Sequence, residues 1–413
     1  MAPTRFDTAD LASVLPAGGR TLVLGCSGES LMLAEAVMGA GDALGAMTFT
    51  GIFIPGLNTR TYLANPACRV ETFFMTPELK AAGEAVTFLP LCYADILARL
   101  RTIKIDAALF MATPPDMERY CGFGPAVDFL AELWPTIPVR VAHLNPLMPR
   151  THGDRGIPFG EITAYCEAPQ PLLALPATGR DPVADAIAGH VAARIPNGAT
   201  IQIGLGKVPA AVLRALSGHR GLRIHSGLIT DAVVDLEAAG ALADGVAVTG
   251  GVAIGTPRLY EATRSPRYRF LPASFSHSPR VIAELESFVS VNSAIEVDLF
   301  GQAYSELGPT GLMSGPGGAS DFARGAWIAG GLRIIALPAS AAHGAISRIV
   351  APNAGAGPVS LGRMDTDVVV TEFGAADLRG KGHLERAKAL VALAPPAHRE
   401  ALEEAWAAFA AKF

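Results

Sequence analysis

Short apolar segments that alternate with helical stretches are the feature that most constrains the fold of this chain. The apolar segments are rich in Val and Ile and are bounded by Gly or Pro, as strands are. Between them lie Ala- and Leu-rich stretches with apolar residues at helical spacing. This alternation predicts an α/β fold of mainly parallel sheets flanked by helices. The predicted strands include 21–25, 107–112, 139–144, 200–204, 222–225, 288–292, 333–338 and 367–372.

Length and an internal repeat predict two similar domains. A chain of 413 residues is longer than one ordinary hydrophobic core requires. Segments 21–37 and 200–216 each read as a strand, a glycine-rich turn and a helix. The stretch 168–182 is rich in Pro and is typical of a linker. We therefore expect an N-terminal domain over 1–180 and a C-terminal domain over 181–413 that carries the active-site motifs.

Composition excludes several classes of function. A net charge of −5 and a pI near 6 argue against nucleic-acid binding. The longest uncharged run, 43–59, is broken by glycines and a proline, and the N-terminus has no apolar signal region. We therefore expect a cytoplasmic protein that neither spans nor binds a membrane. Half of the residues are apolar, which predicts a large core and a homo-oligomer, most simply a dimer.

The five cysteines give no sign of a metal site or a disulfide framework. They are scattered over the first half of the chain, and none forms a CxxC pair. Buried free thiols are the expected state, and we expect no bound metal.

Two glycine-rich turns are candidate ligand sites. The segment 204–211, GLGKVPAA, follows a predicted strand and opens a helix, so its free backbone N–H groups can bind a ligand. The segment 314–326 lets a ligand approach its backbone closely. Neither has the spacing of a phosphate loop or a dinucleotide fingerprint, so we expect no nucleotide redox cofactor. Either segment alone also fits a tight turn. The candidate residues are Gly204, Gly206, Lys207, Gly315, Gly317 and Gly318.

Polar residues near strand ends are further candidates. Asn58 and Arg60 follow a predicted strand and are plausible contacts for a phosphate or carboxylate. The segment 288–302 reads as one buried strand that carries Glu296, with Asn292 and Asp298. Glu372 ends an apolar strand, where sites in α/β proteins usually lie. Each carboxylate is either structural or catalytic.

The segment 221–236 reads as a strand, a turn at Gly227 and a helix. His225, just before this turn, is either a general base or a hydrogen-bonded core residue.

Taken together, these motifs resemble the acetyl-CoA hydrolase/transferase family, and 4-hydroxybutyrate CoA-transferases most closely. The resemblance covers nearly the whole chain and follows the family's order of motifs. It is carried in the first half by NTR (58–60), CGFGPAVDF (121–129) and NPLMPRTHGD (145–154). In the second half it is carried by GLGKVPAAVLRAL, IHSGLITDAVVDLEAAGAL, GTPRLYE, VSVNSAIEVDLFGQ, SGPGGASDFARGA and VVVTEFGAADLRGKGHLERAKALVALAPPAHRE.

The resemblance implies two CoA-transferase-type domains, an acyl-CoA substrate bound between them and, often, a homodimer. Coenzyme A then enters as part of the substrate. In the family a glutamate attacks the acyl-CoA carbonyl to form a mixed anhydride, which CoA thiolate converts to an enzyme thioester. The turn at 204–209 would supply backbone donors to the oxyanions.

The family's glutamate lies in the pattern His-Ser-Glu, whereas this chain has His225-Ser226-Gly227. The flanks match without a gap from Ile224 through Asp231 to Gly240. One hypothesis is that water replaces the glutamate, with His225, Glu296 or Glu372 as base, in hydrolysis of the thioester or cleavage of a carbon–carbon bond in a β-keto acyl-CoA. The alternatives are the usual CoA transfer to a carboxylate and a catalytically inactive CoA-ester-binding protein.

Overall fold

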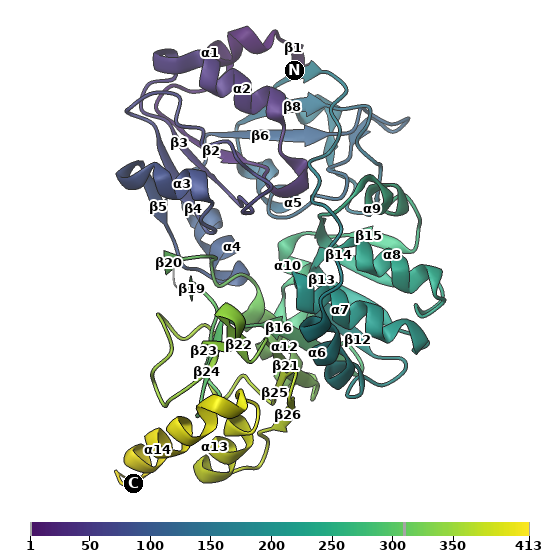
Figure 1. The fold of residues 1–413 in the computed structure, drawn as a ribbon. Coiled ribbons are helices and arrows are strands. Elements are labelled where there is room, and N and C mark those ends of the chain that lie inside the picture. The colour runs from purple at the N-terminus through teal and green to yellow at the C-terminus, as the bar shows by residue number, and fades with distance from the viewer. Residues whose placement is uncertain (1, 309–310, 413) are drawn as a thin grey trace. The chain divides into compact units, whose positions relative to one another are not determined.

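The computed structural model describes residues 2–308 and 311–412, which form two compact units (Figure 1). Unit 1 comprises 1–177, 227–231 and 248–276. Unit 2 comprises 178–226, 232–247 and 277–413. The predicted division at residue 180 stays a prediction; by contacts, two later segments belong with the N-terminal part of the chain.

Unit 1 contains a parallel sheet in the order β1-β11-β8-β6-β2-β3-β4-β5. Its central strands are almost entirely apolar and buried, as a sheet covered on both faces requires. The strands are β1 Thr4–Arg5, β2 Arg20–Val23, β3 Thr48–Gly51, β4 Arg69–Thr72, β5 Val86–Phe88, β6 Ala107–Ala112, β8 Val139–Leu144 and β11 Ala164–Glu167.

Helix α2 covers one face of this sheet, as Figure 1 shows. Its Leu33, Ala34 and Val37 pack with Val23 of β2 and Leu109 of β6 in one hydrophobic cluster. Ser30 caps the helix by accepting a hydrogen bond from the backbone N–H of Leu33. The helices of unit 1 are α1 Leu11–Val14, α2 Leu31–Ala40, α3 Pro77–Ala81, α4 Tyr93–Thr102, α5 Leu130–Leu133, α9 Pro257–Ala262 and α10 Ala273–Ser276.

Unit 1 also holds strands outside this sheet, of which β14 and β15 come from its later segments. β14 pairs in parallel with β15, and β15 with β9. β7 and β10 form a small antiparallel pair. These strands are β7 Tyr120–Cys121, β9 His152–Gly153, β10 Ile157–Pro158, β14 Val248–Ala253 and β15 Tyr268–Phe270.

Unit 2 contains strands in the order β26-β25-β21-β16-β12-β13. All of these neighbours pair in parallel except the hairpin β25–β26. β13 begins in unit 2 and ends in residues assigned to unit 1. The strands are β12 Thr200–Ile203, β13 Arg223–Ile229, β16 Phe288–Ser293, β21 Leu332–Ala336, β25 Val368–Thr371 and β26 Gly374–Asp377.

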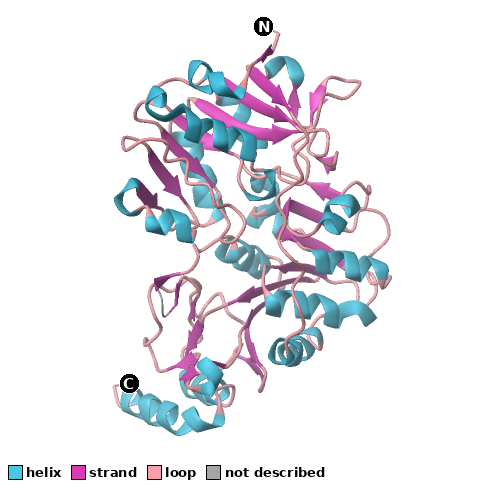
Figure 2. Cartoon of the chain, turned by 45° about the horizontal axis from the view of Figure 1, so that its top comes forward, coloured by secondary structure: helices cyan, strands magenta, loops and turns pink. Residues whose placement is uncertain are grey.

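Helices flank these strands, as the cyan ribbons of Figure 2 show. α11 and α12 pack on the face that carries Phe288, which clusters with Ile282 and Phe322. α6 contacts β25 and β26, and α7 contacts β16. The helices are α6 Pro182–Ala192, α7 Lys207–Ala215, α8 Asp231–Ala238 (whose first residue belongs to unit 1), α11 Pro279–Ile282, α12 Ala319–Ile328, α13 His383–Val391 and α14 Arg399–Ala410.

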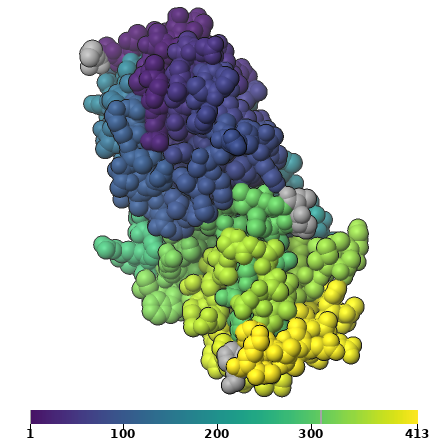
Figure 3. All heavy atoms as spheres, turned by 90° about the vertical axis from the view of Figure 1, so that its left-hand side faces the viewer, coloured from purple at the N-terminus to yellow at the C-terminus, as the bar shows by residue number. Residues whose placement is uncertain are grey.

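A second hydrophobic core of unit 2 is formed by residues of the short strands and of the C-terminal helices. Phe300, Leu390 and Trp406 belong to one cluster, in which α13 packs against α14. In Figure 3 the last residues, coloured yellow, form a continuous outer surface. The short strands are β17 Glu296–Asp298, β18 Ala303–Tyr304, β19 Leu307–Gly308, β20 Gly311–Leu312, β22 Ser340–Ala341, β23 Ile346–Ser347 and β24 Ile349–Val350.

The structure confirms the predicted α/β fold and the strand-turn-helix repeat. The order β8-β6-β2-β3 in unit 1 corresponds to β21-β16-β12-β13 in unit 2. All five cysteines are free and buried, as expected. Across 2–308 and 311–412, no helix combines the length and apolarity that crossing a membrane requires.

One predicted strand was wrong in extent. The segment 288–302 is not a single strand, because the chain leaves β16 after Ser293 and pairs again as β17 with β18 and β24.

Candidate active site

Strand β13 carries the triplet His225-Ser226-Gly227, and the structure corrects the predicted turn at Gly227. The strand continues through Gly227 to Ile229, and α8 begins at Asp231. Gly227 therefore has extended backbone inside a strand. In unit 1 a Cβ built on Gly251 of β14 would lie 3.2 Å from the carbonyl oxygen of Gly227. The backbone at Gly227 is thus closely approached by a second glycine.

The two residues before Gly227 are buried. The Ser226 hydroxyl donates to the carbonyl oxygen of Ile203 at 2.8 Å, which accounts for its position. The His225 side chain is 3% exposed, and its ring meets Phe288 edge-on at 6.5 Å between centroids. His225 thus lies on the sheet face that α12 covers.

A polar network runs along the same face. Residues paired in parallel strands share a face, as do residues two apart on one strand. Ser290 pairs with Gln202 and donates to its Oε1 at 2.6 Å. Asn292 Nδ2 donates to Ser290 Oγ at 3.0 Å, and Gln202 Nε2 donates to Asn292 Oδ1 at 3.4 Å. By register Gln202 is next to His225, so buried polar groups lead from His225 toward the carboxyl end of β16.

The turn after β12 is open at its two glycines. A Cβ on Gly204 would have no heavy atom within 4 Å, so no internal packing demands glycine there. Gly206 has φ +125° and precedes α7, a conformation that favours glycine. Lys207 forms an ion pair with Asp181, Nζ to Oδ2 3.2 Å, on the surface. The Lys207 side chain is 68% exposed in spite of this ion pair.

The second glycine-rich turn leads into α12. Gly315 is buried, Gly317 has φ +61°, and Gly318 is the N-cap of the helix. A Cβ on Gly318 would lie 2.5 Å from Cδ2 and 3.0 Å from Nε2 of His277. Gly318 therefore leaves room for a buried imidazole.

The carboxylates of β17 bind backbone and side-chain donors of unit 2. Glu296 Oε2 accepts from the backbone N–H of Ala356 at 2.8 Å. Asp298 is fully buried and accepts hydrogen bonds from several donors. They are the backbone N–H groups of Phe300, Gln302 and Asn353, the Gln302 amide and the Tyr304 hydroxyl.

Glu372 follows β25 and lies away from His225 in the strand order. Its Oε2 accepts from the backbone N–H of Ala339 at 2.8 Å. β25 is four places from β13, which at about 4.8 Å a strand is about 19 Å. The structure thus does not bring Glu372 next to His225.

Asn58 and Arg60 have internal partners in unit 1. Asn58 Oδ1 accepts from Ile54 N, and its Nδ2 donates to Cys26 O at 3.0 Å and Glu29 Oε2 at 2.9 Å. Arg60 pairs with Glu35 at 3.0 Å on the surface. Burial raises the pKa of Glu29, whose other oxygen accepts from Tyr62. These bonds occupy the Asn58 amide and hold a buried carboxyl.

Sequence reasoning missed His277, Gln202 and Ser290. Polar residues at alternate positions of apolar strands would have signalled Gln202 and Ser290. His277 lies between short helices, where no pattern marks it. Among the described residues no group of three or more His, Cys, Asp or Glu side chains is arranged to hold a metal ion.

Comparison with known proteins gives one family. Residues 255–406 match the acetyl-CoA hydrolase/transferase C-terminal domain. The chain is 36% identical over 316 residues to 4-hydroxybutyrate coenzyme A transferase of Clostridium kluyveri, covering 74% of this chain and 73% of that protein. It is 35% identical over 351 residues to succinyl-CoA:cyclohexane-1-carboxylate CoA transferase of Geobacter metallireducens, covering 82% and 80%. Acetyl-CoA hydrolase of Saccharomyces cerevisiae is 29% identical over 247 residues, covering 56% and 46%.

Solved structures agree with this result. RipA from Yersinia pestis superposes with a TM-score of 0.89 at 27% identity, covering 97% of this chain and 96% of that chain. 4-Hydroxybutyrate CoA-transferase from Porphyromonas gingivalis superposes with a TM-score of 0.82 at 28% identity, covering 99% and 98%. The resemblance read from the motifs is confirmed, and the chain belongs to the acetyl-CoA hydrolase/transferase family, whose members are enzymes that act on CoA thioesters.

Proposed function

We propose that this protein is an acyl-CoA hydrolase that uses water where its transferase relatives use a glutamate. The observation that carries the proposal is Gly227 in β13. The motif resemblance implies that the family's nucleophile has this position. Glycine has no side chain and cannot form the acyl anhydride on which CoA transfer depends. Water is the nucleophile that remains when the carboxylate is missing.

The open turn at 204–206 supports binding and oxyanion stabilisation. Its backbone N–H groups at the start of α7 have no side chain of Gly204 or Gly206 over them. Such donors stabilise the negative oxygen of a tetrahedral intermediate. The glycines at 315–318 are proposed to contact the same substrate.

The proposed base is His225, two residues before Gly227. Water attacks the thioester carbonyl carbon while His225 accepts its proton, and the carbonyl oxygen becomes the oxyanion. The intermediate then expels CoA thiolate, which takes the proton from the imidazolium. The products are a carboxylic acid and free CoA, so atoms and charge balance.

The other candidate bases have structural bonds that weigh against them. Glu296 and Glu372 each accept a backbone N–H, and Glu372 is four strands from β13. His225 lies in β13 itself, two residues from Gly227. The choice among the three bases stays a prediction.

CoA transfer to a carboxylate is the second candidate, favoured by the names of relatives in the family. It requires a carboxylate other than one at position 227. Carbon–carbon cleavage of a β-keto acyl-CoA and inactive CoA-ester binding are the remaining alternatives. The proposed substrate in every case is an acyl-CoA.

The Gly227→Glu variant tests the proposal. We expect the natural protein to release CoA from an acyl-CoA without making a new thioester from added acetate. Gly227→Glu should gain acetyl-CoA formation and a borohydride-sensitive glutamyl thioester. The control is Gly218→Glu, an exposed glycine with no heavy atom within 4 Å of a built Cβ, which should gain neither. Transfer by the natural protein, with trapping at another glutamate, would contradict the proposal.

A further inference from the structure

His277 is a buried imidazole that the proposed reaction has not used. It lies in unit 2 between α10 and α11 and is 5% exposed. Its ring centroid is 5.0 Å from that of Phe322 on α12. His277 therefore lies two residues before α11 and packs against α12.

The edge of this imidazole occupies the place where Gly318 would have a side chain. A Cβ on Gly318 would lie 2.5 Å from Cδ2 and 3.0 Å from Nε2 of His277, and 3.0 Å from Cε2 of Phe322. Real Cβ atoms essentially never come within 3.0 Å of another heavy atom. Gly318 has φ −91°, which any residue adopts, so its glycine is explained by His277 and not by the backbone.

Gly204 provides the contrast. A Cβ there would meet nothing within 4 Å, so that turn is open. At Gly318 the protein instead fills the space with an imidazole. One glycine turn is thus unobstructed, while the other is backed by a specific side chain.

His277 is uncharged at neutral pH. Burial, and then the electrostatic repulsion that a protonated His225 would exert, lower the pKa of His277 to about 3. The two histidines are close enough to influence each other's protonation. If His225 accepts a proton from water, a neutral His277 adds no repulsion to the imidazolium that forms.

We propose that His277 is a positioning residue for the proposed thioester hydrolysis, acting through its edge contact with Gly318 to hold the turn 315–318 in its active conformation. This inference rests on the proposed function. The turn leads directly into α12, so its backbone follows the position of Gly318. An imidazole against Gly318 fixes that backbone more tightly than a small side chain or water would.

A double-mutant cycle tests the contact. The variants are His277→Ala, Gly318→Ala and the double variant, with Gly218→Ala as the control glycine. We expect each single change to lower kcat for short acyl-CoA esters about tenfold or more, with KM changed about threefold at most. In the double variant the new methyl group enters the vacated space, so kcat should exceed the product of the two single effects by about fivefold or more.

Two further measurements separate positioning from general loss of structure. His277→Gln keeps a planar group that reaches Gly318, and we expect it to retain kcat within about threefold of the natural protein. If His277→Ala does not fold, His277→Gln replaces it in the cycle. Because His277 stays neutral, its variants should leave the shape of the pH–rate profile unchanged above pH 5.

The inference would be overturned if the kcat of the double variant equalled the product of the two single effects. It would also be overturned if Gly318→Ala kept the kcat of the natural protein. If the natural protein hydrolyses no acyl-CoA, the proposed function fails, and the same cycle is then measured in urea midpoints and in calorimetric affinity for CoA. Coupling in those readouts supports the contact between His277 and Gly318, and its absence refutes it.

Discussion

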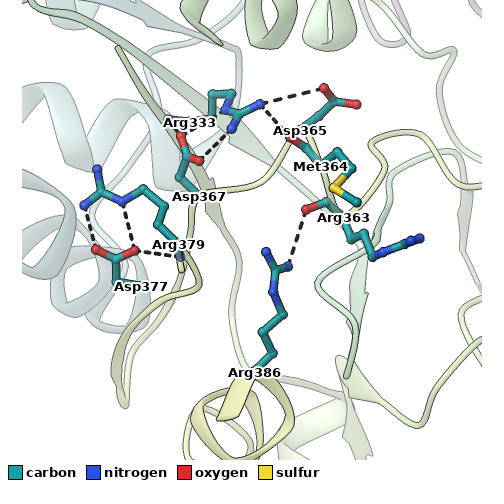
Figure 4. Close-up of polar contacts among 8 residues, drawn as sticks. All are labelled: Arg333, Arg363, Met364, Asp365, Asp367, Asp377, Arg379 and Arg386. Atoms are coloured by element: carbon teal, nitrogen blue, oxygen red, sulfur yellow. Dashed lines mark hydrogen bonds and ion pairs between the residues drawn. The ribbon is translucent and has the colours of Figure 1, made fainter. Parts of the chain in front are cut away.

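Two arginine–aspartate pairs in unit 2 have similar geometry but different burial (Figure 4). We therefore expect substitution of the two arginines to lower the free energy of unfolding by different amounts. Arg333 binds Asp367 through Nε at 2.9 Å and Nη2 at 2.7 Å, with side chains 11% and 8% exposed. Arg379 binds Asp377 through Nε at 3.0 Å and Nη2 at 2.6 Å, with side chains 57% and 45% exposed.

Removing the buried arginine should cost far more than removing the exposed one. Arg333→Met leaves the Asp367 carboxylate buried without its partner and removes the Nη1 bond to Met364 O, so we expect a loss of about 3–5 kcal/mol. Arg379→Met removes an interaction that water largely replaces, so we expect about 1 kcal/mol or less.

Thermal and urea unfolding of both variants measure this difference. At about 2–4 °C per kcal/mol for a folding unit of this size, Arg333→Met should lower Tm by about 6–20 °C. Arg379→Met is the matched control and should shift it by a few degrees at most. Equal shifts in the two variants, or a larger shift for Arg379→Met, would refute the reasoning from burial.

Three further predictions concern pH, binding and assembly. Burial raises the pKa of Asp128 to about 7. The unfolded carboxyl ionises near pH 4, so stability should fall by up to about 4 kcal/mol between pH 4 and 7; urea midpoints of Asp128→Asn should lack this fall. Gly204→Val should fold normally but weaken calorimetric CoA-ester affinity about tenfold or more, and unchanged affinity would exclude this turn. Light scattering should give about twice 42.8 kDa; a mass near one chain would exclude the dimer.

The strands were predictable because their apolar runs are local signals. The runs at 107–112, 200–203 and 368–371 lie in buried strands as expected, since burial on both faces requires apolar residues at every position. The extent of β13 was not predictable, because glycine is typical of turns and only pairing within the sheet keeps Gly227 extended.

The site depended on contacts that the sequence does not reveal. Asn58 binds Glu29, which is 29 residues away, and Glu372 binds the backbone of Ala339. His277 meets Gly318 from a distant segment. The order of the motifs identified the family. Which polar residues have internal partners could be decided only from tertiary contacts between segments that are distant in the sequence.

Turnover of butyryl-CoA in ¹⁸O-labelled water with acetate present identifies the nucleophile most directly. If water attacks the thioester, the products are free CoA and butyrate carrying one ¹⁸O from solvent, with no acetyl-CoA. Acetyl-CoA formed without solvent ¹⁸O in butyrate, together with a borohydride-sensitive glutamate, would show that the chain transfers CoA in spite of Gly227 and would rule out hydrolysis as its main reaction.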